Sequence, residues 1–239
     1  GWSQKDFKTG VESYLSRNTS ESRKVTFDFI RAYLHCYPSR KPIDMVCVLK
    51  LLPYLYDVSC ELLQSVAAEF LTREVGNIID RTRHQPSLQF ACLDAISNSA
   101  LVSGGGRVLE NLFNKENLTQ FVKLMAMCDP SRVYGIVSIT SNYCTEECLS
   151  ICESKSIFDA TCYLLRKISG PDIALNHALA EFKKYFEAVG GGDGASSSDI
   201  HVLKLKHVAA ICGDSAGDNV LWIKALEFFL LESREMQEK

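Results

Sequence analysis

Apolar residues recur every three or four positions in one segment after another of this chain, and this periodicity constrains the fold more than any other feature. The clearest segment runs from Pro86 to about Val102. It places Leu88, Cys92 and Ile96 on one side of a helix. No two segments show the alternation of apolar and polar residues that is typical of paired strands. The sequence therefore predicts an all-α protein.

Proline, glycine and capping residues divide the chain into about fourteen predicted helices. Asp57 or Ser59 is positioned to cap one helix, and Pro53 is expected to kink or end the helix before it. The triplet Gly104 to Gly106 is expected to end the segment that begins at Pro86. Asn117 is expected to cap the helix that follows. Short polar links between these helices predict neighbouring helices that pack as hairpins.

Two segments are less regular. Residues 132–142 are rich in β-branched side chains, which favours a strand, but they lack alternation and lie between two strong helical patterns. We therefore predict a helix there. The glycine- and serine-rich residues 190–199 predict a flexible loop inside a single domain that spans residues 1–239.

The composition indicates a folded protein without a strong electrostatic preference. Hydrophobic residues make up 46% of the 239 residues, and the formal net charge is −3. No global field therefore attracts nucleic acid or an anionic membrane, and a protein partner becomes the first expectation. No apolar run reaches the roughly 18 residues needed to span a bilayer, so we predict no membrane insertion.

The chain begins Gly1, Trp2, Ser3 without an initiator methionine, which we interpret as a piece of a longer protein. Its ten cysteines lie within apolar helical patterns and not at the spacings of a disulfide framework. They are expected to be buried thiols in a reducing compartment, the cytoplasm or the nucleus.

A repeat of about 40 residues is visible in the middle of the chain. Residues 90–125 and 134–165 share one order of elements: a small-residue helix, a short amphipathic helix and a capped helix with paired leucine-like residues. In each repeat the first helix carries a small residue followed by asparagine, Ser97 and Asn98 and then Ser141 and Asn142.

This arrangement resembles the armadillo and HEAT families of helical repeats. The resemblance implies a right-handed superhelical stack of helix hairpins, an α-solenoid, in which neighbouring hairpins bury one another and leave a long curved surface. In peptide-binding armadillo proteins, a row of asparagines holds the backbone of an extended partner, and Asn98 and Asn142 match those positions. The tryptophans of that pattern are replaced by Asp94 and Ser138, so a groove here would bind differently.

The sequence carries no recognisable signature of catalysis or of metal binding. Cys144, Cys148 and Cys152 recur at four-residue intervals, which differs from the close pairs of zinc sites and is more typical of core packing than of metal or redox chemistry. No pair of the five histidines has metal-ligand spacing, and no strand-to-helix nucleophile motif occurs. The sequence predicts a non-enzymatic protein with no cofactor and no metal.

These observations favour a scaffold or adaptor that binds a protein or peptide along a groove of stacked helices. The candidate contact residues are Asn98 and Asn142, with Asp94, Arg81 and Arg83 beside them. Two alternatives stay open: a helical repeat that binds nucleic acid through the basic residues 73–84 and the lysines near Lys204, and a small helical enzyme without a recognisable motif.

Overall fold

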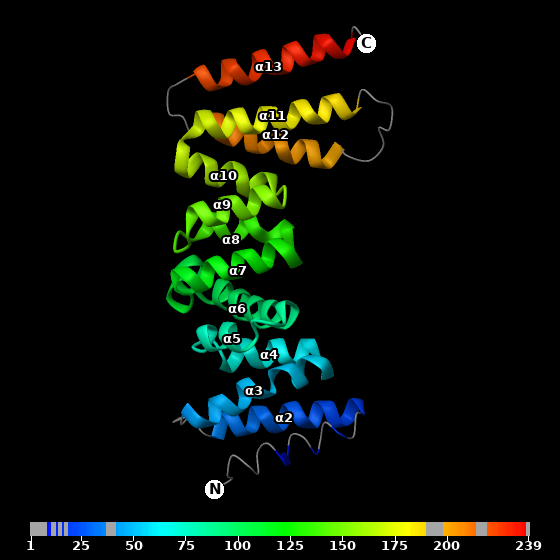
Figure 1. Ribbon diagram of the computed structural model, residues 1–239, viewed down its shortest axis with the longest axis vertical. Coiled ribbons are helices and arrows are strands. Elements are labelled where there is room, and N and C mark those ends of the chain that lie inside the picture. Colours follow the sequence, from blue (N-terminus) through cyan, green and yellow to red (C-terminus); the bar gives the residue numbers. More distant parts are fainter. Residues whose placement is uncertain are drawn as a thin grey trace. The chain divides into compact units, whose positions relative to one another are not determined.

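The computed structural model describes residues 9–10, 13, 16, 19–36, 42–189, 198–213 and 219–237. Within these residues the regular structure is helical and no strand occurs, which confirms the all-α prediction (Figure 1). The helices of the first half of the chain are α2 (Ser20–Cys36), α3 (Pro42–Val58), α4 (Cys60–Phe70), α5 (Val75–Arg81), α6 (Pro86–Leu112) and α7 (Lys115–Cys128). Those of the second half are the 3₁₀ turn η1 (Pro130–Arg132), α8 (Val133–Ile139), α9 (Thr145–Ser154), α10 (Phe158–Ser169), α11 (Pro171–Val189), α12 (Ser198–Gly213) and α13 (Val220–Gln237).

The chain forms two compact units, Gly1–Leu124 and Met125–Lys239. In the first unit α6 packs against α3, α4 and α5, and α2 contacts α4. In the second unit α10 contacts α8, α9, α11 and α12, while α13 packs on α11 and α12. Each unit is therefore organised around one helix that touches several others, α6 in the first and α10 in the second.

The start of α4 follows the predicted capping chemistry. The backbone amide of Leu62 donates to the Ser59 hydroxyl at 3.4 Å, so of the two candidate caps Ser59 is the one used. Pro53 does not end the preceding helix, because α3 continues to Val58. The fully buried side chains of Leu52 and Leu55 anchor this part of α3 in the core, which offsets the hydrogen bond that proline cannot donate.

The predicted break at the glycine triplet is confirmed as a kink within α6. Gly104 and Gly105 have non-helical backbone angles, and Gly105 has a φ of +66°, a conformation that strongly favours glycine. The helical hydrogen bonding resumes beyond the kink and runs to Leu112. The glycines thus separate two helical segments, which the bounds of α6 join across the kink.

The cap predicted for α7 lies three residues too late in the chain. The side-chain oxygen of Asn114 accepts from the backbone amide of Asn117 at 2.8 Å, so Asn114 and not Asn117 provides the cap. Both asparagines suit such a position, and the choice depends on where the preceding helix ends. Since α6 extends to Leu112, the next helix begins at Lys115.

The β-branched segment 132–142 is helical only in its middle part. It forms α8 from Val133 to Ile139, after which Thr140 adopts an extended backbone. The buried Tyr143 then donates its hydroxyl proton to the carbonyl of Val137 at 2.9 Å, which ties the link back onto the helix. Of the predicted loop 190–199, residues 190–197 lie outside the described residues, and Ser198 and Asp199 belong to α12.

The core of the second unit is formed by α10, α11 and α12, together with one side of α13. Its buried residues are Cys162, Leu165, Ala174, Leu175, Ala178, Leu179, Phe182, Val208, Ile211, Cys212, Leu221 and Ala225. Phe182 lies at the centre, with its ring 6.4 Å from that of Phe158 and 5.3 Å from that of Phe229, both edge to face. Only a narrow strip of α13 takes part in this core.

Candidate protein-docking site

The predicted residues Asp94 and Asn98 lie on consecutive turns of α6 and contact each other. The Asn98 amide donates to the Asp94 carboxylate at 3.1 Å, as the four-residue spacing permits. Asp94 is 8% exposed, whereas Asn98 faces solvent. The pair presents an amide whose orientation is held by a buried carboxylate, which suits a contact to a partner's backbone.

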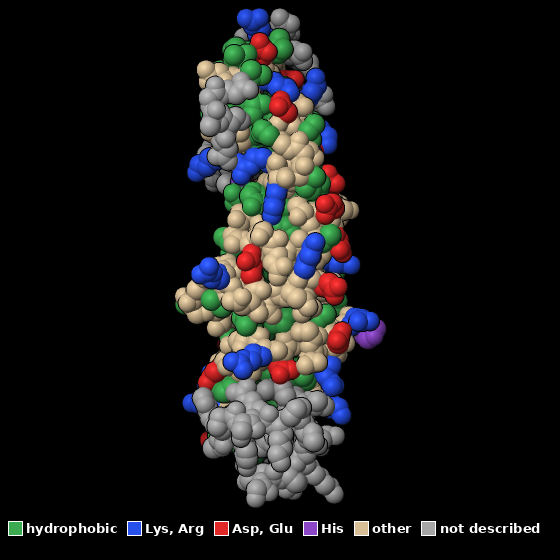
Figure 2. All heavy atoms as spheres, turned by 90° about the vertical axis from the view of Figure 1, so that its left-hand side faces the viewer, with side chains coloured by type: hydrophobic (Ala, Val, Ile, Leu, Met, Phe, Trp, Pro, Cys, Tyr) green, Lys and Arg blue, Asp and Glu red, His purple; other side chains and the backbone are tan. Residues whose placement is uncertain are grey.

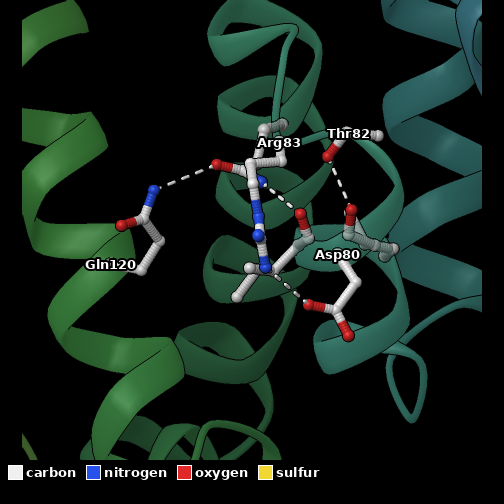
Figure 3. Close-up of polar contacts among 7 residues, drawn as sticks. Asp80, Thr82, Arg83 and Gln120 are labelled. Atoms are coloured by element: carbon white, nitrogen blue, oxygen red, sulfur yellow. Dashed lines mark hydrogen bonds and ion pairs between the residues drawn. The ribbon is translucent and has the colours of Figure 1, made fainter.

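The predicted residues Arg81 and Arg83 lie at the end of α5 and just beyond it, both on the surface. Arg83 lies 3.4 Å from the carboxylate of Asp80, and both side chains are 70% exposed (Figure 3). The intervening Thr82 is buried and donates its hydroxyl proton to the carbonyl of Ile78 at 2.6 Å. An ion pair this exposed stabilises the fold little, so the Arg83 guanidinium, like that of the exposed Arg81, can take part in other contacts.

Gln89 is a buried polar residue that the sequence analysis missed. Its amide nitrogen donates to the carbonyl of Ile79 at 2.8 Å, and its amide oxygen accepts from Gln120 at 3.2 Å (Figure 3). With 1% of its surface exposed, it links α5, α6 and α7 through side-chain hydrogen bonds. A single glutamine on the apolar side of α6 was the signal in the sequence.

The fifth predicted residue, Asn142, lies in the second unit, in the link between α8 and α9. It is half-buried, and its backbone amide donates to the Thr140 hydroxyl at 3.3 Å. The first four predicted residues belong to the first unit, where Asp94 contacts Asn98 directly. The two asparagines therefore have different surroundings: Asn98 lies within a helix and Asn142 in a turn.

The largest group of exposed apolar side chains lies on α13, where the sequence analysis predicted no site. Trp222, Ile223, Leu226 and Leu230 recur at three- and four-residue spacing and are 40%, 52%, 58% and 62% exposed. They form one continuous side of the helix, which we name the α13 stripe. Val220 and Leu231 add exposed apolar surface beyond it.

The opposite side of α13 is held on α11 by charge as well as by packing. Lys224 lies 3.8 Å from Asp172, and Lys183 lies 3.6 Å from Glu232, whose side chain is 11% exposed. These pairs and the buried Leu221 place the inner side of the helix against α11. In the second unit α13 lies on one side of α11 and α12 (Figure 1). The exposed side chains of the α13 stripe lie on the side of the helix away from the buried Leu221 and Ala225.

The edge of the α13 stripe carries one acidic and one basic residue, Glu227 and Arg234, both exposed. Neither takes part in an ion pair among the residues that the structure describes. A surface that is mostly apolar with a few charges at its margin is the usual composition of a protein interface.

The cysteine prediction is confirmed for α9 in part. Cys148 and Cys152 are buried, and removal from water raises the pKa of each thiol to about 12, whereas Cys144 is only half-buried. Thiols with so high a pKa are poor nucleophiles near neutral pH. Within the described part of the chain, no group of three or more His, Cys, Asp or Glu side chains is placed to hold a metal ion.

A surface recess of ≈ 280 Å³ lies in the first unit between the end of α3 and the start of α6. It is lined by Tyr56, Asp57, Gln85, Pro86, Ser87 and Leu88. Apart from Leu88 these residues are exposed or half-buried, so water is not excluded from the recess. It lacks the dry, enclosed environment in which catalytic groups act.

Basic and acidic side chains are mixed on the surface. On the face drawn in Figure 2, neither sign forms a continuous patch over the described helices. None of the helices that the structure describes is both long enough and apolar enough to cross a bilayer. Comparison of the chain with protein-family models, with curated proteins and with solved structures finds no match in any of the three.

Proposed function

We propose that this chain is a protein-binding module that presents the α13 stripe to another protein. The observation that carries the proposal is the row of four large, half-exposed apolar side chains on one helix. Burying such side chains gives on the order of 1 kcal/mol for each half-exposed residue. Contiguous exposed apolar surface of this kind marks interaction sites on folded proteins.

The chemistry of the stripe favours a helix as the docking element. Ile223, Leu226 and Leu230 follow the spacing that pairs one amphipathic helix with another. Trp222 adds the side chain that most often dominates the binding energy of an interface. The mixed surface charges favour a protein over nucleic acid as the partner.

We further propose the armadillo- or HEAT-like α-solenoid as the architecture of the module. The helix hairpins within each unit support it, as does the 40-residue sequence repeat. In this scheme Asn98, Asp94, Arg81, Arg83 and Asn142 provide additional contacts to the partner. The described cysteines are free thiols, which suits a reducing compartment such as the cytoplasm or nucleus.

Site-specific photo-cross-linking tests the proposal. A photoreactive phenylalanine analogue replaces Leu226 in the full chain inside cells, and Leu205 carries it in a matched control, because Leu205 is an exposed leucine on α12. We expect a cross-linked polypeptide at position 226 that is absent at position 205. The absence of any polypeptide at position 226, or equal cross-linking at both positions, would contradict the proposal.

A further inference from the structure

We propose that the partner of the α13 stripe is the α13 stripe of a second copy of this chain, packed antiparallel about a two-fold axis. This inference rests on the proposed function, because it names the protein that the module binds. It follows from the distribution of charge along the edge of the stripe and from the amount of apolar surface that the stripe offers.

The two edge charges restrict which helix can lie on the stripe. Glu227 and Arg234 are seven residues apart, which separates them by about 10.5 Å along the helix axis, so they are too far apart to pair within one helix. Among helices that could lie on the stripe, the charges favour one that brings a basic side chain to Glu227 and an acidic one to Arg234.

The chain's own α13 carries that complementary pair. In an antiparallel arrangement, Leu226 of one copy packs against Leu230 of the other. Because helical side chains lean toward the N-terminus of their own helix, Glu227 of each copy then reaches toward Arg234 of the other. A parallel, in-register pair would instead put the Glu227 and Arg234 edges of the two copies on opposite sides of the interface, so that neither charge meets a complementary one. The charges therefore select the antiparallel pairing.

The arrangement of the apolar side chains fits the same pairing. Leu226 and Leu230 lie one turn apart on the same side of the helix, so a reversed copy exchanges the two leucines and keeps both contacts apolar. In this register Trp222 lies at the level of position 234 of the other copy. Only Glu227 and Arg234 carry charge along this side of the helix among the described residues. Neither charge has to be buried in the pairing, which avoids a desolvation cost.

The size of the interface predicts a weak, reversible dimer. An 18-residue helix is about 27 Å long, and its half-exposed stripe offers on the order of 500 Å² per copy, less than the roughly 800 Å² of a standard interface. We therefore expect dissociation constants of roughly 10–100 µM, so that the monomer and the dimer exchange at ordinary protein concentrations.

Sedimentation equilibrium of the full chain tests the pairing, at concentrations from about 1 µM to about 200 µM. The mass is expected to rise from 26.7 kDa toward twice that value. Leu226→Asp with Leu230→Asp is expected to keep the chain monomeric, whereas Leu205→Asp on α12 leaves dimerisation unchanged. Circular dichroism verifies that each variant remains folded. A chain that stays monomeric over the whole range would overturn the inference.

A charge-exchange series makes the test specific for the antiparallel pairing. Glu227→Arg alone places like charges at both symmetric contacts, and Arg234→Glu alone does the same, so each is expected to weaken dimerisation about threefold to tenfold. The double variant Glu227→Arg with Arg234→Glu restores opposite charges and is expected to recover the original affinity. Failure of the double variant to recover would exclude this register.

The cross-linking experiment separates this inference from the function on which it rests. If the product at position 226 has the mass of two copies and joins two α13 peptides, the proposed function and the self-pairing are both supported. If position 226 reacts with a different polypeptide while the chain sediments as a monomer, the proposed function stands and the self-pairing fails. If the chain instead floats with phosphatidylcholine vesicles and cross-links to lipid alone, both fail.

Discussion

α6 and α13 have similar sequences in one respect, since each carries apolar residues around most of its circumference, yet their surroundings differ. Between Leu88 and Ala100, α6 buries apolar side chains on nearly every side, and even Gln89, Asp94 and Ser97 are buried there. α13 buries Leu221 and Ala225 but exposes the four side chains of its stripe. A helix that is apolar all round usually lies in the interior of a protein. Such a helix can therefore complete a core or remain available for another protein, depending on which helices lie beside it.

The largest effect is expected when a buried leucine of α6 is truncated; truncation of Leu226 on α13, described below, provides the comparison. Leu93 on α6 is fully buried, so Leu93→Ala should leave a cavity and lower the free energy of unfolding by about 3 kcal/mol. Urea denaturation monitored by circular dichroism measures the loss. A loss below about 1 kcal/mol would mean that the surroundings of α6 are as open as those of α13.

The next effect concerns the buried hydrogen bonds of α6. Gln89→Leu removes the side chain that links Ile79 and Gln120, and we expect a loss of about 1–3 kcal/mol because the half-buried Ile79 carbonyl is left without this donor. Gln120→Leu is the matched control: it breaks only the longer of the two hydrogen bonds, and at a half-buried position, so its effect should be smaller. Equal losses in urea denaturation would argue against a special role for Gln89.

A smaller effect is expected at the kink of α6. Gly105→Ala introduces a side chain at a φ of +66°, which should cost about 1–2 kcal/mol, although nothing lies within 4 Å of the added carbon. Thermal unfolding of the variant measures the change. An unchanged or higher melting temperature would show that this residue can adopt ordinary helical angles and that the kink is not required.

The smallest effect on folding is predicted for the stripe itself. Leu226→Ala should change the free energy of unfolding of the monomer by no more than about 0.5 kcal/mol, because Leu226 is 58% exposed. Dilute protein is needed for this urea experiment, so that association does not contribute. A loss as large as that of Leu93→Ala would place Leu226 in a core and remove the contrast between the two helices.

The sequence predicted local structure well where one residue type determines the outcome. The hydroxyl of Ser59 caps α4, and the glycines at 104 and 105 kink α6, because each residue supplies a conformation or a hydrogen bond that few others can. Predictions failed where two outcomes had similar energies. Asn114 and Asn117 are equally good caps, and Pro53 can be held inside a helix when its neighbours are anchored in a core.

The candidate site was harder to predict than the fold. Hydrophobic periodicity states which residues are apolar but not whether a neighbour covers them, so the α13 stripe could not be distinguished from a core surface. Arg81, Arg83, Asp94, Asn98 and Asn142 were chosen from charge and from the repeat, and their roles as contacts stay predictions. The hydrogen bond from Asn98 to Asp94 does follow from their four-residue spacing.

The ion pairs that connect α13 to α11 have a consequence for orientation. A helix with apolar side chains around most of its circumference buries a similar apolar area at several rotations about its own axis. Hydrophobic packing alone therefore restricts that rotation only weakly. The buried Leu221 and Ala225 set this rotation, and the ion pairs of Lys224 with Asp172 and, two turns later, of Glu232 with Lys183 favour the same angle. They decide which leucines face inward, and thereby which ones another molecule can meet.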